Sequence, residues 1–390
     1  MKQEMNWKKL LLSSLSYILV AAIASAATLL FCGPRNSKLT ELEKLIEEQF
    51  VGQYDEAYVQ DVAAAAMVAA LGDQWSFYVT AEEYDALMSD MSNSFVGIGV
   101  TVTQHTGGLG EEIVNVIEGG PAFEAGLQVG DIMIRVNGTD LAGLDALGAK
   151  NLIAGKEGTQ VEITVLRGEQ ELSFSVTLQT IRIAVANGQM LAGNIGLVRI
   201  ENFNDNCAKE TIAAIGQLQE QGATALIFDV RNNPGGYVNE MVKILDYLLP
   251  ECVVFREVDY RGVEGARYSG ASCIELPIAV LVNGDSYSAA EFFAACLQEY
   301  DKAVVVGERT CGKGYYQYTI QLSDGSAVNL STGKYFTPSG KNLTETGGLT
   351  PDIPLAVDEE TAVKIYANLL TPEEDPQLQA AVGAILGTNG

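Results

Sequence analysis

The sequence predicts an α/β core that carries an inserted β-rich domain and follows an N-terminal helical arm. Between residues 181 and 354, buried strand patterns alternate with amphipathic helix patterns, which is typical of a layered α/β fold. Between residues 95 and 180, short β-runs are broken by glycine, which indicates a separate strand-rich domain. With 390 residues, of which 47% are hydrophobic, the chain is long enough for two or three domains with buried cores.

Residues 1–36 are predicted to form a signal anchor, that is, a transmembrane helix. Lysines precede an uncharged run from Leu10 to Pro34, which at about 25 residues is long enough to cross a bilayer as a helix. Positive charge before the run places the N-terminus in the cytoplasm and the rest of the chain outside the cell membrane. The alternatives are a signal peptide cleaved near Ala24-Ser25-Ala26, which would make the protein secreted, and a lipid anchor on Cys32.

Residues 37–94 are predicted to form the helical arm. Leu39, Leu42 and Leu45 recur at helical spacing, and residues 80–83 have the pattern of a capping box. The apolar face of the arm is expected to pack on its own chain or, through residues 37–90, on a second copy in a homodimer.

Apolar runs and helical periodicity define the expected elements of the core domain, residues 181–370. They are strands at 195–200, 223–230 and 278–282, helices at 205–221 and 237–249, and antiparallel strands at 315–322 and 327–336. The tail, residues 371–390, is acidic and then alanine-rich, and is expected to form a peripheral helix.

Charge and cysteine spacing narrow the range of partners. The formal net charge of −26, without a basic stripe, argues against nucleic-acid binding. The six cysteines form no CxxC pair and no Cys/His spacing suited to zinc, so no metal and no cofactor is expected. Cys252 and Cys273 flank a predicted hairpin and would pair in an oxidising compartment, but free cysteines are the favoured interpretation.

The stretch from Asn283 to Gln317 carries the first candidate chemistry. Ser286 and Ser288 lie in a turn before a predicted helix, and Lys313 follows one strand later. The only histidine, His105, is far away in a glycine-rich loop, which favours a Ser-Lys pair over a Ser-His-Asp triad. From these residues alone, a solvated surface lysine remains the alternative for Lys313.

A second turn, Arg231 to Gly236, follows another buried strand. Strand ends of an open α/β sheet meet at one edge, so both turns are expected to face one cleft. The Pro234-Gly235-Gly236 sequence leaves backbone amides unobstructed by Cβ atoms, as an oxyanion hole requires, although a simple tight turn is the alternative.

The glycine-rich segment has a specific resemblance. Gly119 to Asp131, followed by Val136-Asn137-Gly138, resembles a PDZ domain of the bacterial, protease-associated kind, which places that domain at residues 95–180. The resemblance implies that a glycine-hydrophobic loop presents backbone N–H groups to a substrate's C-terminal carboxylate, and that the peptide adds as a strand. The helix expected at 144–153 would form the other wall of the groove. The loop residues are Val96, Gly97, Ile98, Gly99 and Val100.

Several further motifs occur in one order with that segment. They are residues 231–236, 288–291, 307–314 with Gln317, 335–340 and 348–353. Together they resemble the carboxy-terminal (tail-specific) processing proteases over residues 40–355. The resemblance implies a catalytic domain of the caseinolytic-protease/crotonase kind and a Ser-Lys serine endopeptidase.

The resemblance also implies roles for individual residues. The nucleophile falls on Ser288, the general base on Lys313, 25 residues later, and an assisting glutamine on Gln317. The oxyanion donors fall on the backbone N–H groups of Ala289 and of a glycine in the 234–236 turn, chiefly Gly235.

Other residues of this region receive different expectations. Ser286 is expected to be a turn residue, and Glu291 a structural residue near the helix start. The chain departs from the family pattern at Tyr287, where a small residue is usual, and at Ala290 and Cys311.

The expected function is therefore a serine endopeptidase acting on exported proteins, whose C-termini it recognises through the PDZ domain. We also expect that the PDZ domain gates the catalytic site. Two rivals remain: a catalytically inactive PDZ-bearing adaptor of the same fold, and a crotonase-like acyl-CoA enzyme.

Overall fold

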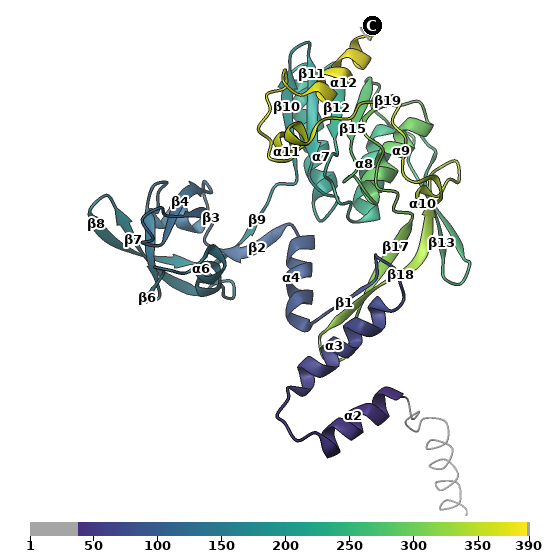
Figure 1. Ribbon diagram of the computed structural model, residues 1–390. Helices are drawn as coiled ribbons and strands as arrows, with labels where there is room; N and C mark the ends of the chain where they lie inside the picture. The colour runs from purple at the N-terminus through teal and green to yellow at the C-terminus, as the bar shows by residue number, and fades with distance from the viewer. Residues whose placement is uncertain (1–37, 388–390) are drawn as a thin grey trace, which may run out of the picture. The chain divides into compact units, whose positions relative to one another are not determined.

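The computed structural model describes residues 38–387 (Figure 1). The predicted signal anchor, residues 1–36, lies outside the described residues. Within residues 38–387, no helix is both long enough and apolar enough to cross a membrane. The chain divides into a unit that ends at Val62 and a unit that begins at Ala63, and each is described by itself.

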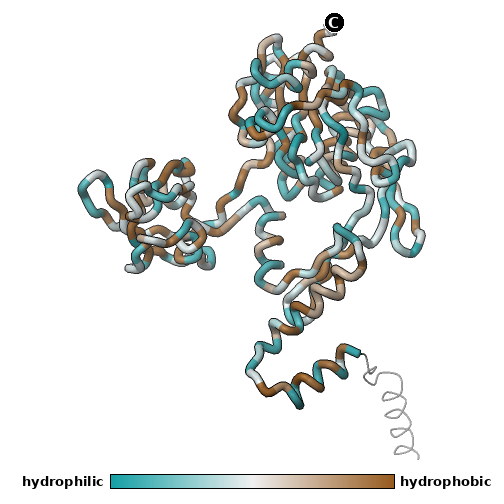
Figure 2. The backbone as a smooth tube through the Cα atoms, in the orientation of Figure 1, coloured by the Kyte–Doolittle hydropathy of each residue, from teal (hydrophilic) through white to brown (hydrophobic). Residues whose placement is uncertain are grey.

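The first unit contains α2 (Lys38–Gln49) and the beginning of α3 (Glu56–Ala69). The periodicity of its leucines predicted α2, and the helix is present. Leu39, Leu42 and Leu45 are all exposed, and α2 has no buried residue. Figure 2 shows polar and apolar residues alternating along this helix. The apolar face of α2 is therefore not covered.

The second unit begins with the rest of α3, then β1 (Phe77–Val79) and α4 (Ala81–Met91). The predicted capping box at the start of α4 is confirmed: the Glu83 N–H donates to Thr80 Oγ1, and the Thr80 N–H donates to Glu83 Oε2 at 2.8 Å.

Residues 94–182 form a β-rich body with its own hydrophobic core around Ile113, Met133 and Ile163. Its main sheet has the order β3-β4-β5-β7-β8, with β6 beside β5, and β2 pairs with β9. Between β2 and β3 the chain turns at Gly99, whose φ of +80° is a conformation that glycine adopts without strain. The elements are β2 (Ser94–Gly97), β3 (Val100–Gln104), β4 (Glu111–Val116), α5 (Pro121–Ala125), β5 (Ile132–Val136), β6 (Thr139–Asp140), α6 (Ala146–Ile153), β7 (Gln160–Arg167), β8 (Gln170–Thr177) and β9 (Gln179–Arg182).

The core domain is built on a six-stranded sheet. Its first two strands are antiparallel, and the remaining neighbours are parallel. The predicted βαβ architecture is thereby confirmed. In sheet order the strands are β10 (Ala186–Leu191), β11 (Ile195–Ile200), β12 (Ala225–Asp229), β15 (Ile278–Val282), β16 (Ala303–Gly307) and β19 (Ile353–Pro354).

Alternate residues of these strands face two separate hydrophobic layers, as the period of two requires. Phe228 and Val280 pack in the layer formed with α7 (Cys207–Glu220), α8 (Val238–Leu248) and α9 (Ala289–Glu299). Ile227 and Leu281 pack in the other layer, against Leu378 of α12 (Pro376–Leu386). Helices therefore cover both faces of the sheet.

The expectation of a peripheral C-terminal helix is wrong, because α12 is part of this second layer. Leu378 and Ala381 are buried in it. Asp375, at the start of the helix, binds the buried Arg231 guanidinium at 2.7 Å, and Gln377 accepts from Arg231 at 3.0 Å. The alanine-rich composition hid this role, since small side chains permit close packing against a sheet.

A second sheet carries further residues of the site. Its order is β1-β18-β13-β14, and β17 also pairs with β18. The two predicted long antiparallel strands are confirmed as β17 and β18, and β1 adds from the N-terminal side. The strands are β13 (Val253–Asp259), β14 (Glu264–Tyr268), β17 (Tyr315–Gln321) and β18 (Ala327–Phe336), and the short helices α10 (Leu343–Thr346) and α11 (Glu359–Tyr366) follow them.

Cys252 and Cys273 are free thiols, so the alternative of a disulfide between them is not realised in this structure. Cys252 Sγ lies 3.3 Å from Ser269 Oγ.

Candidate active site

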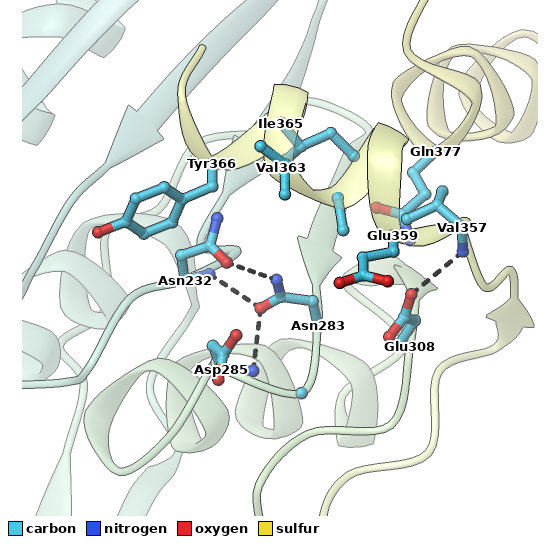
Figure 3. Close-up of a pocket in the computed structure, with 12 residues that line it drawn as sticks. Asn232, Asn283, Asp285, Glu308, Val357, Glu359, Val363, Ile365, Tyr366 and Gln377 are labelled. Atoms are coloured by element: carbon cyan, nitrogen blue, oxygen red, sulfur yellow. Dashed lines mark hydrogen bonds between the residues drawn. The ribbon is translucent and has the colours of Figure 1, made fainter.

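Two turns at the carboxyl ends of the adjacent parallel strands β12 and β15 form the base of the site, as predicted. Two asparagines join them: the Asn232 backbone N–H donates to Asn283 Oδ1 at 2.8 Å, and Asn283 Nδ2 donates to Asn232 Oδ1 at 2.7 Å (Figure 3). The Tyr287 N–H also donates to the Asn233 carbonyl. These bonds fix one turn against the other.

A pocket of about 320 Å³ lies beside Asn232 and Asn283, under α11 (Figure 3). Asp285, Glu308 and Glu359 give it an acidic lining, but Ser288, Lys313 and Gln317 are not part of it. All three predicted catalytic residues instead line a different pocket, of about 560 Å³, between α4, the turn at residues 231–236 and the strands β17 and β18. This second pocket is the candidate active site.

Ser288 occupies a strained position immediately before α9. Its φ is +59° and its ψ is −126°, a region that non-glycine residues rarely adopt and that costs about 1–3 kcal/mol. Gly235 passes so close that a Cβ there would lie 2.7 Å from the Ser288 Cβ, so only glycine fits. The strain holds a buried serine at the start of a helix, where the dipole favours developing negative charge.

The Ser288 hydroxyl is hydrogen-bonded to the Tyr335 hydroxyl at 2.8 Å. Tyr335 is 3% exposed and packs against Phe255, Phe292 and Tyr316. Burial raises the pKa of Tyr335, so its phenol stays neutral at physiological pH. Sequence reasoning included Tyr335 in a family motif but gave it no role.

Glu291 connects the serine to the lysine loop. Its carboxylate accepts the backbone N–H groups of Ser288 at 3.0 Å, Gly312 at 2.6 Å and Lys313 at 2.9 Å, together with the Thr310 hydroxyl at 2.5 Å. Burial raises the pKa of this fully buried carboxyl, while the four hydrogen bonds oppose the shift. Glu291 therefore has the expected structural role: its carboxylate holds the backbone of Ser288 and the backbone of Lys313 at a fixed spacing.

The Lys313 amine lies against two aromatic rings that also pack on each other. Its Nζ is 4.6 Å from the centre of the Trp75 ring and 5.9 Å from the centre of the Tyr287 ring. Burial lowers the pKa of Lys313 from its ordinary value near 10.5 to about 8. A substantial fraction of this lysine is thus neutral near physiological pH, as a general base must be. The interpretation as a solvated surface lysine does not hold.

Gln317 lies on β17, and its Nε2 donates to the Tyr315 carbonyl and to Ser331 Oγ. Among the described residues, no hydrogen bond joins any two of the side chains of Ser288, Lys313 and Gln317. The structure therefore brings the three residues to one pocket without a hydrogen bond between their side chains.

The predicted oxyanion donors differ in availability. The Gly235 N–H donates to Asn233 Oδ1 at 2.8 Å, so in this structure it is not free to bind an oxyanion. Within residues 38–387, the N–H groups of Ala289 and of Gly236, the next glycine of the turn, have no hydrogen-bond partner. The sequence could not show that the Asn233 side chain engages the first of these glycines.

Ser286 serves the turn, as expected. Its hydroxyl donates to the Val230 carbonyl at 2.7 Å and accepts the Asn283 N–H at 3.0 Å.

The predicted peptide-binding loop joins β2 to β3. Val96 is exposed and Ile98 is buried, while Gly99 supplies the turn. Over the described part of the chain, the N–H groups of Ile98 and Gly99 have no hydrogen-bond partner, although both carbonyls accept one. Val100 begins β3, an edge strand that α6 contacts. An edge strand beside a helix is the arrangement that a peptide needs to add as a further strand.

Comparison with known proteins agrees with this geometry. Residues 194–355 match the family model "Peptidase family S41", and residues 96–178 match "PDZ domain". The carboxy-terminal processing protease CtpA of Bacillus subtilis is 31% identical over 85% of this chain and 74% of its own length. The carboxyl-terminal-processing protease of Synechocystis is 31% identical over 83% of this chain and 76% of its own length.

A solved structure supports the fold. A putative S41 protease from Bacteroides fragilis, 18% identical, aligns over 87% of this chain and 91% of its own with a TM-score of 0.50. The predicted resemblance is confirmed: this chain belongs to the carboxy-terminal processing proteases, serine-type peptidases of family S41 that carry a PDZ domain.

Proposed function

We propose that the protein is an endopeptidase that cleaves by a Ser-Lys mechanism, with Ser288 as nucleophile, Lys313 as general base and Gln317 as an assisting residue. One observation carries the proposal: the strained, buried Ser288 and a Lys313 whose pKa is about 8 line the same pocket. No cofactor takes part in this mechanism.

The reaction proceeds in two halves. The neutral Lys313 amine accepts the Ser288 hydroxyl proton while Oγ bonds to the scissile carbonyl carbon, which gives a tetrahedral oxyanion. The ammonium then protonates the leaving nitrogen, the C–N bond breaks, and an acyl-enzyme remains. Water attacks the acyl-enzyme with Lys313 again as base, and Ser288 regains its proton. Free N–H groups in the turn and at the start of α9 support stabilisation of the oxyanion.

The resting geometry implies a movement before the chemistry. The Ser288 hydroxyl is bonded to Tyr335, and the Lys313 amine lies on Trp75, so their side chains must turn toward each other. We propose that a C-terminal peptide bound at Val96 to Val100 promotes this change. A peptide with a free carboxylate should raise the turnover of a small substrate, whereas the same peptide with an amidated C-terminus should not. Equal turnover with both peptides would refute gating.

We propose exported proteins with accessible C-termini as the substrates, and action outside the cytoplasmic membrane. The free N–H groups of the loop and the open edge of β3 support recognition of a terminal carboxylate. Comparing the secreted and membrane proteomes of wild type and a Ser288→Ala strain should reveal substrates with changed C-termini. Identical C-termini in both strains would contradict this assignment.

A catalytically inactive adaptor is the second candidate, because among the described residues no hydrogen bond joins the side chains of Ser288 and Lys313. Incubating the purified chain with an unfolded protein substrate separates the two functions. Peptides released by wild type and not by Ser288→Ala support the protease, whereas release by neither supports the adaptor.

We also propose that the chain forms a homodimer through the arm, because the leucine face of α2 is exposed. Light scattering should give twice the mass of one chain for wild type and the mass of one chain for the Leu42→Glu variant. A monomeric wild type would contradict this.

A further inference from the structure

The surroundings of the Lys313 amine carry an inference that rests on the proposed role of this lysine as general base. Among the described residues, Lys313 Nζ has neither an ion-pair partner nor a hydrogen-bond partner, and the groups that approach it are the rings of Trp75 and Tyr287. These rings lie 5.9 Å apart and are tilted by 32°, so they pack on each other and the amine lies to one side of the pair. We propose that Trp75 and Tyr287 form an aromatic pair that positions the Lys313 amine and keeps water from it.

Trp75 is fixed by the second sheet. Its carbonyl accepts Asn329 Nδ2 at 3.1 Å, and the next residue, Ser76, accepts the Ser331 N–H at 3.0 Å. Both partners lie on β18, and β1, which begins at Phe77, pairs with the same strand. The N-terminal segment of the second unit therefore places this ring at the lysine through backbone and side-chain bonds.

Tyr287 belongs to the turn that carries Ser288. It lies directly before Ser288, and its N–H donates to the Asn233 carbonyl, in the turn at residues 231–236, at 3.1 Å. According to the family resemblance a small residue is usual at this position, and a small residue there would remove one of the two rings. Through Tyr287, the aromatic pair thus connects the lysine to both turns of the site.

The rings act on Lys313 in two opposing ways. Their faces attract the ammonium, which favours the charged form, while their bulk removes water, which favours the neutral form. The charged or titratable groups that act on Lys313, namely Cys311, Glu291 and Asp73, all favour the ammonium. Because the pKa nevertheless falls to about 8, the removal of water outweighs every other effect.

Direct titration of Lys313 tests the effect of the aromatic pair on this amine without relying on catalysis. In the full chain carrying Ser288→Ala, the rate of Lys313 carbamylation by cyanate is measured by mass spectrometry as a function of pH. The midpoint for this parent should lie near 8. Adding Trp75→Ala or Tyr287→Ala should move it upward by about one pH unit.

Two controls sharpen the test. Adding Tyr287→Phe should restore the parental midpoint, because the ring remains. Adding Tyr260→Ala removes an aromatic side chain that is 77% exposed on another turn, and should leave the midpoint unchanged. Unchanged midpoints in folded Trp75→Ala and Tyr287→Ala chains would refute the proposal that these rings keep water from the amine. Retained proteolysis by Lys313→Arg would instead refute the general base, whatever the midpoints show.

Discussion

Ser288 and Lys313 line the same pocket, but their surroundings differ in kind. The serine is held by hydrogen bonds: its backbone N–H donates to Glu291, and its hydroxyl meets Tyr335. The lysine amine lies against the packed rings of Trp75 and Tyr287, and only its backbone N–H reaches Glu291. The proposed nucleophile therefore depends on directional bonds and backbone strain, whereas the proposed base depends on the exclusion of water.

A serine and a lysine become reactive in different ways. A serine gains from a fixed direction and from nearby amides that stabilise negative charge. A lysine gains from losing its hydration, because its pKa must fall before it can accept a proton. Substitutions that separate these two contributions should affect the protein in different ways.

The largest effect is expected from Ser288→Ala, which should lower kcat by at least about 10³-fold, because the acyl-enzyme cannot form. The measurement is cleavage of an unfolded protein, with circular dichroism to show that the fold is kept. Ser286→Ala is the matched control, since that hydroxyl only bonds the turn, and it should retain most of the activity. Loss of activity in Ser286→Ala alone would exchange the roles of the two serines.

Lys313→Arg should lower kcat by about 10²–10⁴-fold, because a guanidinium keeps the charge but does not lose its proton. For wild type, kcat/KM should rise with pH with a midpoint near 8, since the neutral amine is the active form. An active Lys313→Arg enzyme with the same midpoint would assign the base to another group.

Glu291→Gln should lower kcat by roughly tenfold to a hundredfold, because it misplaces Ser288 and Lys313 together. Its amide cannot accept from all four donors, and each buried donor left unpaired costs about 1–3 kcal/mol of unfolding free energy. The control is Glu299→Gln at the other end of α9, whose carboxylate accepts from Thr337 and Ser339. An equal loss of kcat in both variants would mean that Glu291 acts through stability alone.

The smallest effect concerns stability. Lys313→Met should raise the free energy of unfolding at pH 7 by about 1–3 kcal/mol, because a buried ammonium is replaced by an apolar chain. The pKa of Lys313 is lower in the folded state than its ordinary value near 10.5. Between pH 8 and that value the unfolded wild type binds more protons, so wild type gains stability as pH rises and the difference should shrink. Urea unfolding at pH 7 and pH 10 measures both, and a less stable Lys313→Met at pH 7 would contradict the cost of burying this charge.

The sequence predicted the parts of the site that local pattern determines. Apolar runs placed the turns at Arg231 and Asn283 after two buried strands, and parallel strands bring such ends together. It missed the contacts made between distant segments. Trp75 reaches Lys313 only because β1 adds to the second sheet, and Tyr335 reaches Ser288 only through the fold of β18. Periodicity reports which face of an element is buried, but not which residues of other elements meet it.

The most direct test of the central claim, that Ser288 is activated by Lys313, is the rate of fluorophosphonate labelling as a function of pH. The site of labelling is read by mass spectrometry in wild type, Ser288→Ala and Lys313→Arg. We expect labelling of Ser288 in wild type, with a rate that rises through a midpoint near pH 8. We expect no label at that site in Ser288→Ala and at least about a hundredfold slower labelling in Lys313→Arg. Labelling of another residue, or an unchanged rate in Lys313→Arg, would show that Lys313 does not activate Ser288.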